Sequence, residues 1–272
     1  MGRLRFGPAG VPLSAPKRDT ITGIIHTGAL GLDAMELEFV YGVRLKKDVA
    51  EEAKKIAKEK DIVLTAHAPY YINLNAKEQS KIDKSIKMLL DSARILHIAG
   101  GWSVVFHSGW YMGKPKEEAY HRVKESIETV VKTLQDEGIK IWIRPETMEM
   151  EKKFGTIDEV IKLSQDIEMV LPCIDFAHIR YRYHNKSLSF FRSILERIEN
   201  ELGKEAIENM HIHMSGIKLD PKGTHLNLNQ SDIPWQEILK LLKEFKVRGV
   251  VISESPNIEG DAIMMKKYWD QL

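Results

Sequence analysis

Six side chains that can bind metal ions stand at the ends of six successive short apolar segments. They are His67, His107, Glu146, Asp175, His213 and Glu254. Each one alone has an ordinary explanation, because a polar residue at a strand end is usually hydrogen-bonded or solvated. Gathered at one place, three carboxylates and three imidazoles would repel one another or stay unpaired without a cation. Mixed imidazole and carboxylate ligands suit Zn²⁺, Mn²⁺ or Fe²⁺, so the pattern predicts a metal site.

The apolar segments are candidate strands, and longer helical patterns separate them. The eight strand candidates are 3–7, 34–40, 62–67, 103–108, 139–146, 168–175, 210–215 and 249–255. Helical patterns cover 14–30, 45–60, 77–99, 116–137, 156–166, 187–202 and 234–246, and only a short tail follows Gly260. Alternating strands and helices indicate βαβ units around a parallel sheet. We therefore expect an α/β fold, a (β/α)₈ TIM barrel, with the active site at the C-terminal ends of the strands.

Composition bounds the class of protein. The chain has 272 residues and no Pro/Gly/Ser-rich linker, so a single domain over 1–272 is expected. Its net charge of +1 neither supports nor excludes nucleic-acid binding, and any basic surface must be local. The lone Cys173 allows no intrachain disulfide and fits a reducing compartment. No secretory signal is visible and no apolar run approaches ~20 residues, so we expect a cytoplasmic protein with no membrane partner.

Three more histidines belong to the predicted strand ends. His178 follows Asp175 at a D-x-x-H spacing, and His225 lies on the long loop after the seventh strand. His211 precedes His213 by two residues, so it shares the inward face but lies deeper, as a core or supporting residue. Cys173 lies inside the sixth strand and is expected to pack rather than react. The remaining histidines, which we expect to be structural or exposed, are His26, His97, His121 and His184.

The blocks of sequence around these residues follow a recognisable order. "HAPYYINL" is followed by "FHSG", "PET", "CIDFAHI", "HMSG", "THL" and "SESP". The first block resembles the H-x-x-Y-x-I-N-L signature of the endonuclease IV family of abasic-site (AP) endonucleases, and the later blocks are similar to further family motifs. This family belongs to the xylose-isomerase-like TIM barrel superfamily. The resemblance covers roughly residues 3 to 258 and marks the chain as a divergent member.

The resemblance implies a cluster of two or three zinc ions, with Mn²⁺ as another candidate metal. His67 and His107 would hold one ion, Glu146 would bridge to a second held by Asp175, His213 and Glu254, and His178 and His225 would hold a third. In the family a carboxylate stands two residues before the last histidine, where this chain has Gly223. Asp220 or Asp232 could replace it, although neither has the motif spacing. A second departure places Met148 and Glu149 directly after "PET".

The family activity implied is cleavage of double-stranded DNA 5′ to an abasic site, a step of base excision repair. Metal ions would lower the pKa of the attacking water and neutralise charge on the phosphate, and Glu146 would position that water. The resemblance places Tyr70 and Tyr71 in the duplex at the lesion, although both rings could instead pack on the barrel rim. Phosphate contacts are expected from Arg44, Lys46, Lys47, Lys114, Lys116 and the "RYRYHNK" stretch at 180–186. The protein would act as a monomer.

Two other classes of function remain open. Sugar isomerases and epimerases of the same superfamily place Glu, Asp, His and Glu at the ends of strands five to eight. Glu146, Asp175, His213 and Glu254 fit that set equally well, with one Mn²⁺ or Mg²⁺ to polarise a ketose. The extra histidines and the tyrosine pair distinguish the nuclease interpretation from this one. The third class is a non-catalytic DNA-binding or metal-binding relative.

Overall fold

Eight parallel strands form the centre of the computed structural model, which describes residues 2–272. The strands are β1 (Leu4–Pro8), β2 (Ala34–Glu38), β3 (Val63–His67), β4 (Ser103–Phe106), β5 (Trp142–Pro145), β6 (Cys173–Asp175), β7 (Met210–Met214) and β10 (Gly249–Ser253). They pair as two four-stranded sheets, in the orders β1-β10-β7-β6 and β2-β3-β4-β5. Isolated parallel bridges close the ring, from Ala9 to Glu36 on one side and from Glu146 to Cys173 on the other. The predicted TIM barrel is confirmed.

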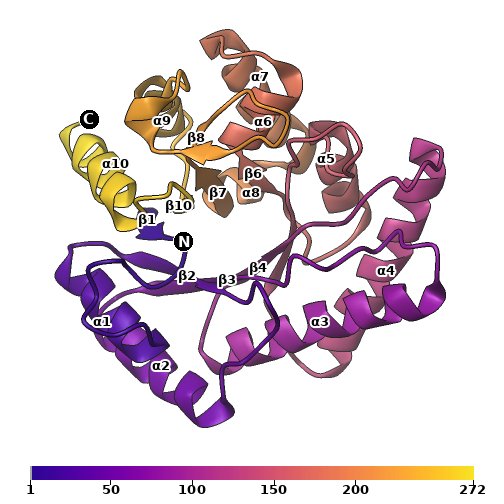
Figure 1. Ribbon diagram of the computed structural model, residues 1–272, viewed down its shortest axis with the longest axis horizontal. Coiled ribbons are helices and arrows are strands. Elements are labelled where there is room, and N and C mark those ends of the chain that lie inside the picture. The colour runs from indigo at the N-terminus through magenta and orange to yellow at the C-terminus, as the bar shows by residue number, and fades with distance from the viewer. Residues whose placement is uncertain (1) are drawn as a thin grey trace.

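Helices surround the ring (Figure 1). The predicted ones are α1 (Thr20–Ala29), α2 (Lys47–Glu59), α3 (Gln79–Ile98), α4 (Lys116–Asp136), α5 (Ile157–Asp166), α7 (Leu188–Leu202) and α9 (Trp235–Glu244). They form close to their expected bounds, except that α1 begins six residues after the expected start at 14. Three further helices are α6 (Phe176–Tyr183), α8 (Lys204–Glu208) and α10 (Glu259–Gln271). The expected short tail is thus wrong, because α10 packs on β1 and completes the last βα unit. No helix within residues 2–272 is long and apolar enough to cross a membrane.

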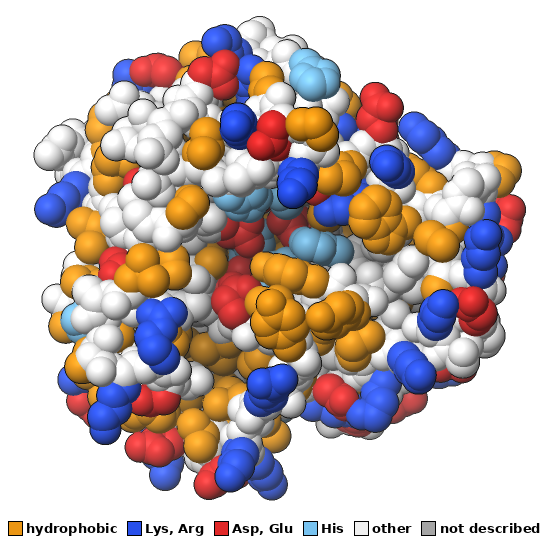
Figure 2. Space-filling view, viewed as in Figure 1, with side chains coloured by type: hydrophobic (Ala, Val, Ile, Leu, Met, Phe, Trp, Pro, Cys, Tyr) orange, Lys and Arg blue, Asp and Glu red, His pale blue; other side chains and the backbone are white. Residues whose placement is uncertain are grey.

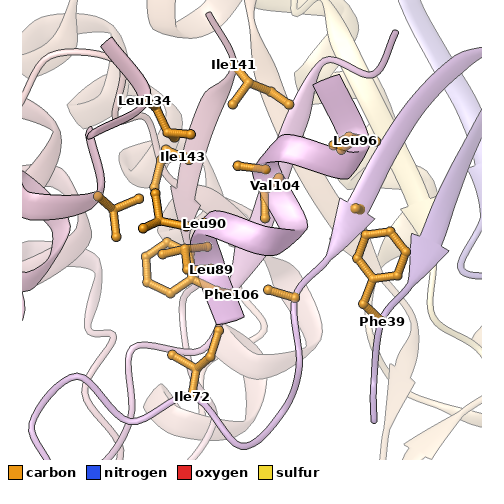
Figure 3. Packing of buried hydrophobic residues seen from close by; sticks show 14 of the residues in the cluster. Phe39, Ile72, Leu89, Leu90, Leu96, Val104, Phe106, Leu134, Ile141 and Ile143 are labelled. Carbon is orange, nitrogen blue, oxygen red and sulfur yellow. The ribbon is translucent and has the colours of Figure 1, made fainter. Parts of the chain in front are cut away.

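The core between helices and strands explains why the ring is stable. Leu89 and Leu96 of α3 lie with Val104 and Phe106 of β4 and Ile143 of β5, and all five are fully buried (Figure 3). Each such side chain contributes about 1.5–3 kcal/mol relative to an exposed one. Burial on both faces is the normal state of a parallel strand, and it accounts for the nearly continuous apolar runs in the sequence.

Two departures from regular βα units shape the mouth of the barrel. The predicted strand 168–175 shortens to β6 because Pro172 has no N–H to donate to a sheet. After β7 the chain forms a small antiparallel hairpin, β8 (Gly216–Ile217) and β9 (His225–Leu226), followed by the 3₁₀ turn η1 (Leu228–Gln230). Gly223 lies in the hairpin turn with a φ of 62°, a left-handed conformation that glycine adopts without strain.

Candidate metal centre

The six strand-end side chains meet at the carboxyl end of the barrel, with Glu146 in their midst. His67 Nε2 and His107 Nε2 lie 3.2 and 3.0 Å from Glu146 Oε2. His213 Nδ1 lies 3.0 Å from Glu146 Oε1 and 3.3 Å from Glu254 Oε1. In Figure 2 pale-blue histidines and red carboxylates line the bottom of a hollow in this face. Residues from distant parts of the sequence therefore form one cluster.

The ligand atoms fall into three overlapping sets, in each of which all atoms lie within 4.8 Å of one another. The sets are His67, His107 and Glu146; Glu146, Asp175, His213 and Glu254; and Asp175, His178, His225 and Glu254. Shared carboxylates link each set to the next, as in sites that hold adjacent ions. A fourth group, Cys173, His211 and His213, lies deeper, where burial raises the pKa of the Cys173 thiol and keeps it protonated. The three linked sets are the better candidates for a metal cluster.

Backbone carbonyls fix the orientation of three of the histidines. Nδ1 of His67 donates to the backbone carbonyl of Ala68 at 2.8 Å. In the same way, Nδ1 of His178 donates to the carbonyl of Thr147 at 2.9 Å, and Nδ1 of His225 donates to the carbonyl of Glu254 at 3.2 Å. With Nδ1 carrying the proton, Nε2 presents a lone pair to the cluster. The Nε2 atoms of His178 and His225 then face each other at 3.3 Å, a separation that either a proton on one ring or a metal ion bound by both can bridge. The residues therefore fit a bound metal, and the hydrogen bonds are those that metal-ligating histidines usually make.

The D-x-x-H spacing has a local structural cause. Asp175 is the N-cap of α6, and its Oδ1 accepts a hydrogen bond at 2.7 Å from the backbone N–H of His178. An N-cap carboxylate and a residue three positions later lie side by side at the start of a helix. Oδ2 of Asp175 is buried without a hydrogen-bond partner, so it is available as a ligand.

In the absence of metal, protons take the place of the cations. Burial disfavours the charged form of Glu146, but the charge of His213 and hydrogen bonds from three histidines hold its pKa well below the usual range. Burial also disfavours the charged His67 ring, yet Glu146 outweighs it and raises the pKa of His67 to about 9. Burial raises the pKa of Asp175 to about 6 and that of Glu38 to about 8. So many opposed shifts within one cluster are typical of functional sites.

Two carboxylates of this centre were missed by the sequence reasoning. Glu36 is fully buried, accepts a hydrogen bond from Thr65 Oγ1 at 2.8 Å, and lies 3.0 Å from His211 Nε2 and 2.9 Å from His213 Nε2. Glu38 lies two residues further along β2, at the mouth, with Oε1 buried and unpaired. Both could have been found, because alternation in "AMELEFV" places positions 36 and 38 on one face. His211 also bonds Ser103 Oγ at 2.6 Å inside the barrel, a supporting position rather than a rim position.

Several side chains that the sequence analysis singled out have other partners within the protein. The Asp220 carboxylate bonds Thr224 and the Lys222 N–H within its own turn, and Asp232 pairs with Arg180 and Lys186, so neither joins His178 and His225. Arg182 donates to the carbonyls of Met148, Met150 and Lys153. The two arginines of the stretch 180–186 thus hold neighbouring loops in place. Lys114 pairs with Glu118, and Lys116 lies 5.8 Å from the centre of the Tyr111 ring.

An aromatic rim borders the centre. Tyr71 and Tyr41 are exposed by 66% and 72%, with ring centroids 6.5 Å apart. Tyr70 is half-exposed and its ring stacks on the His107 ring at 5.2 Å, so it covers a candidate ligand. Figure 2 shows hydrophobic side chains gathered at this edge of the hollow.

A groove of about 930 Å³ runs beside the aromatic rim. Its lining includes Glu36, Glu38, Tyr41, Arg44 and Lys46. Arg44 is exposed, so its guanidinium is free to contact an anion that enters the groove. The groove therefore joins the buried carboxylates of β2 to the basic loop that follows this strand.

Enzymes of the TIM-barrel class have their active sites at the carboxyl ends of the strands, which is where the candidate metal ligands of this barrel cluster. The chain belongs to the xylose isomerase-like TIM barrel family, whose model matches residues 27–269. An uncharacterized protein of Methanocaldococcus jannaschii is 43% identical over 99% of this chain and 98% of its own length. A probable endonuclease 4 of Aquifex aeolicus is 26% identical over 73% of each chain.

Solved structures agree on the fold. Endonuclease IV from Thermus thermophilus has a TM-score of 0.76 at 19% identity, covering 97% of this chain and all of that one. The 3-keto-D-glucoside 4-epimerase of E. coli has a TM-score of 0.71 at 14% identity, covering 98% of this chain and all of that one. At these identities the likeness concerns the barrel, and the site must decide between the two chemistries.

Proposed function

We propose that this protein is a metal-dependent phosphodiesterase that incises double-stranded DNA 5′ to abasic sites, with zinc ions as the resident metal. The observation that carries the proposal is the number of linked ligand sets. His67 and His107 form one set with Glu146, and His178 and His225 form another beyond Asp175 and Glu254. An enzyme with a single ion needs only the middle set. Several adjacent ions suit an in-line displacement at phosphorus, where both the attacking and the leaving oxygen need stabilisation.

Metal ions held by these residues would supply Lewis-acid stabilisation of the phosphate and a lowered pKa for the attacking water. The chain's own residues do the positioning. Glu146, with both carboxylate oxygens in contact with histidines, would orient that water. Three backbone carbonyls hold the imidazole rings so that the lone pairs face inward before substrate arrives. No protein nucleophile is required.

The rim supports a distorted duplex as the substrate. Tyr71 and Tyr41 are exposed aromatic faces beside the hollow, and stacking on an unpaired base stabilises by ~1–3 kcal/mol per base. Tyr70 acts differently, because its ring already stacks on His107 and can present only its outer face. Arg44 is an exposed cation in the lining of the groove beside this rim, and it is the phosphate contact we propose. With a net charge of +1, affinity must come from such local contacts.

One observation favours the epimerase alternative. The middle set, Glu146, Asp175, His213 and Glu254, is complete by itself as a ligand set for one ion. A single Mn²⁺ held there could polarise a ketose, with a carboxylate moving the proton. This alternative leaves the outer histidines and the exposed tyrosines without a role.

Incision of a labelled duplex with one tetrahydrofuran abasic analogue tests the proposal. We expect cleavage 5′ to the analogue with Zn²⁺, Mn²⁺ or Co²⁺, no cleavage of the undamaged duplex, and a loss of at least about 100-fold in Glu146→Gln. The control is Glu151→Gln, an exposed carboxylate of the neighbouring loop, which should cleave like wild type. Absence of incision with all three metals, together with interconversion of a ketose, would establish the epimerase alternative instead.

A further inference from the structure

The groove beside the aromatic rim has a larger lining than the proposed incision uses. Its volume is about 930 Å³, and its lining includes Tyr41, Arg44 and Lys46 from the loop after β2. Arg18, from the loop after β1, also lines it. The proposed incision assigns no role to Arg18 or Lys46. The groove is therefore a candidate site for a part of the substrate other than the scissile phosphate.

Three cations of this lining have no anionic partner. Arg18, Arg44 and Lys46 are all exposed, and none of them forms an ion pair with a carboxylate within residues 2–272. Arg18 Nη1 donates to the Pro12 carbonyl at 2.7 Å, which holds the guanidinium in place and leaves its other N–H donors for a ligand. Unpaired cations gathered in one groove attract a phosphate backbone.

The acidic residues of the same lining have other partners or lie deeper. The two carboxylate oxygens of Asp19 accept hydrogen bonds from the N–H and the hydroxyl of Thr22, each at 2.8 Å. Glu36 is fully buried beside two histidines of the barrel interior. Glu38 is less exposed than the three cations, and its Oε1 is buried. A ligand that enters the groove from solvent therefore meets the cations first.

Hydrogen bonds hold both loops that form the groove. The N–H groups of Leu13 and Ser14, in the loop after β1, donate to the two carboxylate oxygens of Glu259 at the start of α10, each at 2.8 Å. The loop after β2 is joined to the loop after β3, where the N–H of Tyr70 donates to the Val40 carbonyl at 3.4 Å. The groove is thus formed before a ligand binds, which lowers the entropic cost of binding.

An exposed aromatic ring lies beside the three cations. Tyr41 is 72% exposed, and its ring centroid lies 6.5 Å from that of Tyr71. In an intact duplex each base is covered by its neighbours in the stack, so a tyrosine ring stacks only on a base that has left the stack. A positively charged groove with aromatic side chains is typical of proteins that bind single-stranded nucleic acid.

We propose that this groove binds a single-stranded segment of DNA next to the incision site, with Arg18, Arg44 and Lys46 on its phosphates and Tyr41 stacked on one of its bases. The inference rests on the proposed function, because the strand in the groove continues from the strand held at the metal centre. It specifies the preferred substrate as an abasic site that adjoins a gap or a frayed end.

The test is binding of a labelled single-stranded dT oligomer of roughly 10 nucleotides to the zinc-loaded chain, measured by fluorescence anisotropy at several salt concentrations. The oligomer should bind more tightly than a blunt, undamaged duplex of the same length. Arg18→Gln and Lys46→Gln should each lower the slope of log Kd against log salt concentration by about 0.7. Tyr41→Ala should weaken binding at least about 5-fold. The control is Lys140→Gln, which removes an exposed cation just before β5, at the opposite end of the barrel, and should change neither slope nor affinity.

The substituted side chains are exposed, so the variants should fold like wild type. Unchanged salt slopes in Arg18→Gln and Lys46→Gln would overturn the inference, and so would equal binding of the single strand and the blunt duplex by wild type. An acidic peptide of the same net charge that displaces the oligomer as well as unlabelled dT does would also overturn it. Failure of the proposed function gives a different result, because single-strand binding by a chain that does not incise the tetrahydrofuran duplex removes only the link to incision.

Discussion

Replacing Glu36 by glutamine tests how the barrel interior prepares the metal centre. Glu36 Oε1 lies 2.9 Å from His213 Nε2, so a carboxylate charge stands beside this ring on the side opposite Nδ1, which contacts Glu146. The same carboxylate lies 3.0 Å from His211 and accepts from Thr65. Glu36→Gln keeps the shape but removes the charge that makes the imidazole a stronger ligand.

Loss of such a supporting group usually lowers metal affinity 10–100-fold, or about 1.4–2.7 kcal/mol. We expect the upper part of this range, because Glu36 is fully buried and its charge is not screened by solvent. The assay is competition for Zn²⁺ against a fluorescent chelator at pH 6.5. Glu151→Gln, which removes an exposed carboxylate from the loop after β5, is the control and should bind Zn²⁺ like wild type. Equal affinities for wild type and Glu36→Gln would refute the reasoning.

Three other outcomes are expected. In the metal-free protein the folded-state pKa of His67, about 9, lies above the unfolded value of 6.5, and that of Glu38, about 8, lies above 4.5. The stabilisation by these bound protons is therefore lost as pH rises through 8 and 9, so Tm should fall between pH 7 and 9.5 and added Zn²⁺ should reduce the fall; a flat Tm would contradict this. Tyr71→Ala with Tyr41→Ala should weaken binding to abasic duplex about 10-fold or more by fluorescence anisotropy and leave zinc content unchanged, whereas equal binding would remove the rim from the substrate site. Leu89→Ala should lower the free energy of unfolding by about 2–5 kcal/mol in urea titrations, and a change below about 1 kcal/mol would show that the α3 contact is not part of the core.

Much of the barrel could be predicted because its signals are local. Apolar runs ended by polar residues place β3, β4 and β7 within a residue or two, and periodicity places α3 and α4. The sequence is less informative where one residue changes the local geometry. Pro172 shortens β6, and the helix α6 begins at the N-cap Asp175 inside a segment that the sequence marks only as a ligand motif. The helix after Gly260 lacks a strong apolar face, so its sequence resembles a tail.

Part of the candidate site could likewise be predicted from the sequence, and part could not. Strand-end residues such as His107 and Glu254 were found because a barrel topology places them around one mouth. Contacts between loops could not be found from the sequence. The pairing of Asp232 with Arg180 of α6 and the approach of Glu149 to Gly223 depend on how the segments after the strands fold over the barrel. No spacing rule relates such residues, since each loop has its own length and turns.

The ring of strands consists of two half-sheets, and the candidate metal centre takes residues from both. Regular pairing stops between β5 and β6, and only isolated bridges such as Glu146 to Cys173 span the gap. His67 and His107 come from one half-sheet, whereas Asp175, His213 and Glu254 come from the other. An ion bound by Glu146 and its neighbours would thus link the two half-sheets of the barrel. We expect metal loading to make the two halves of the barrel unfold together, so the centre would serve cohesion as well as chemistry.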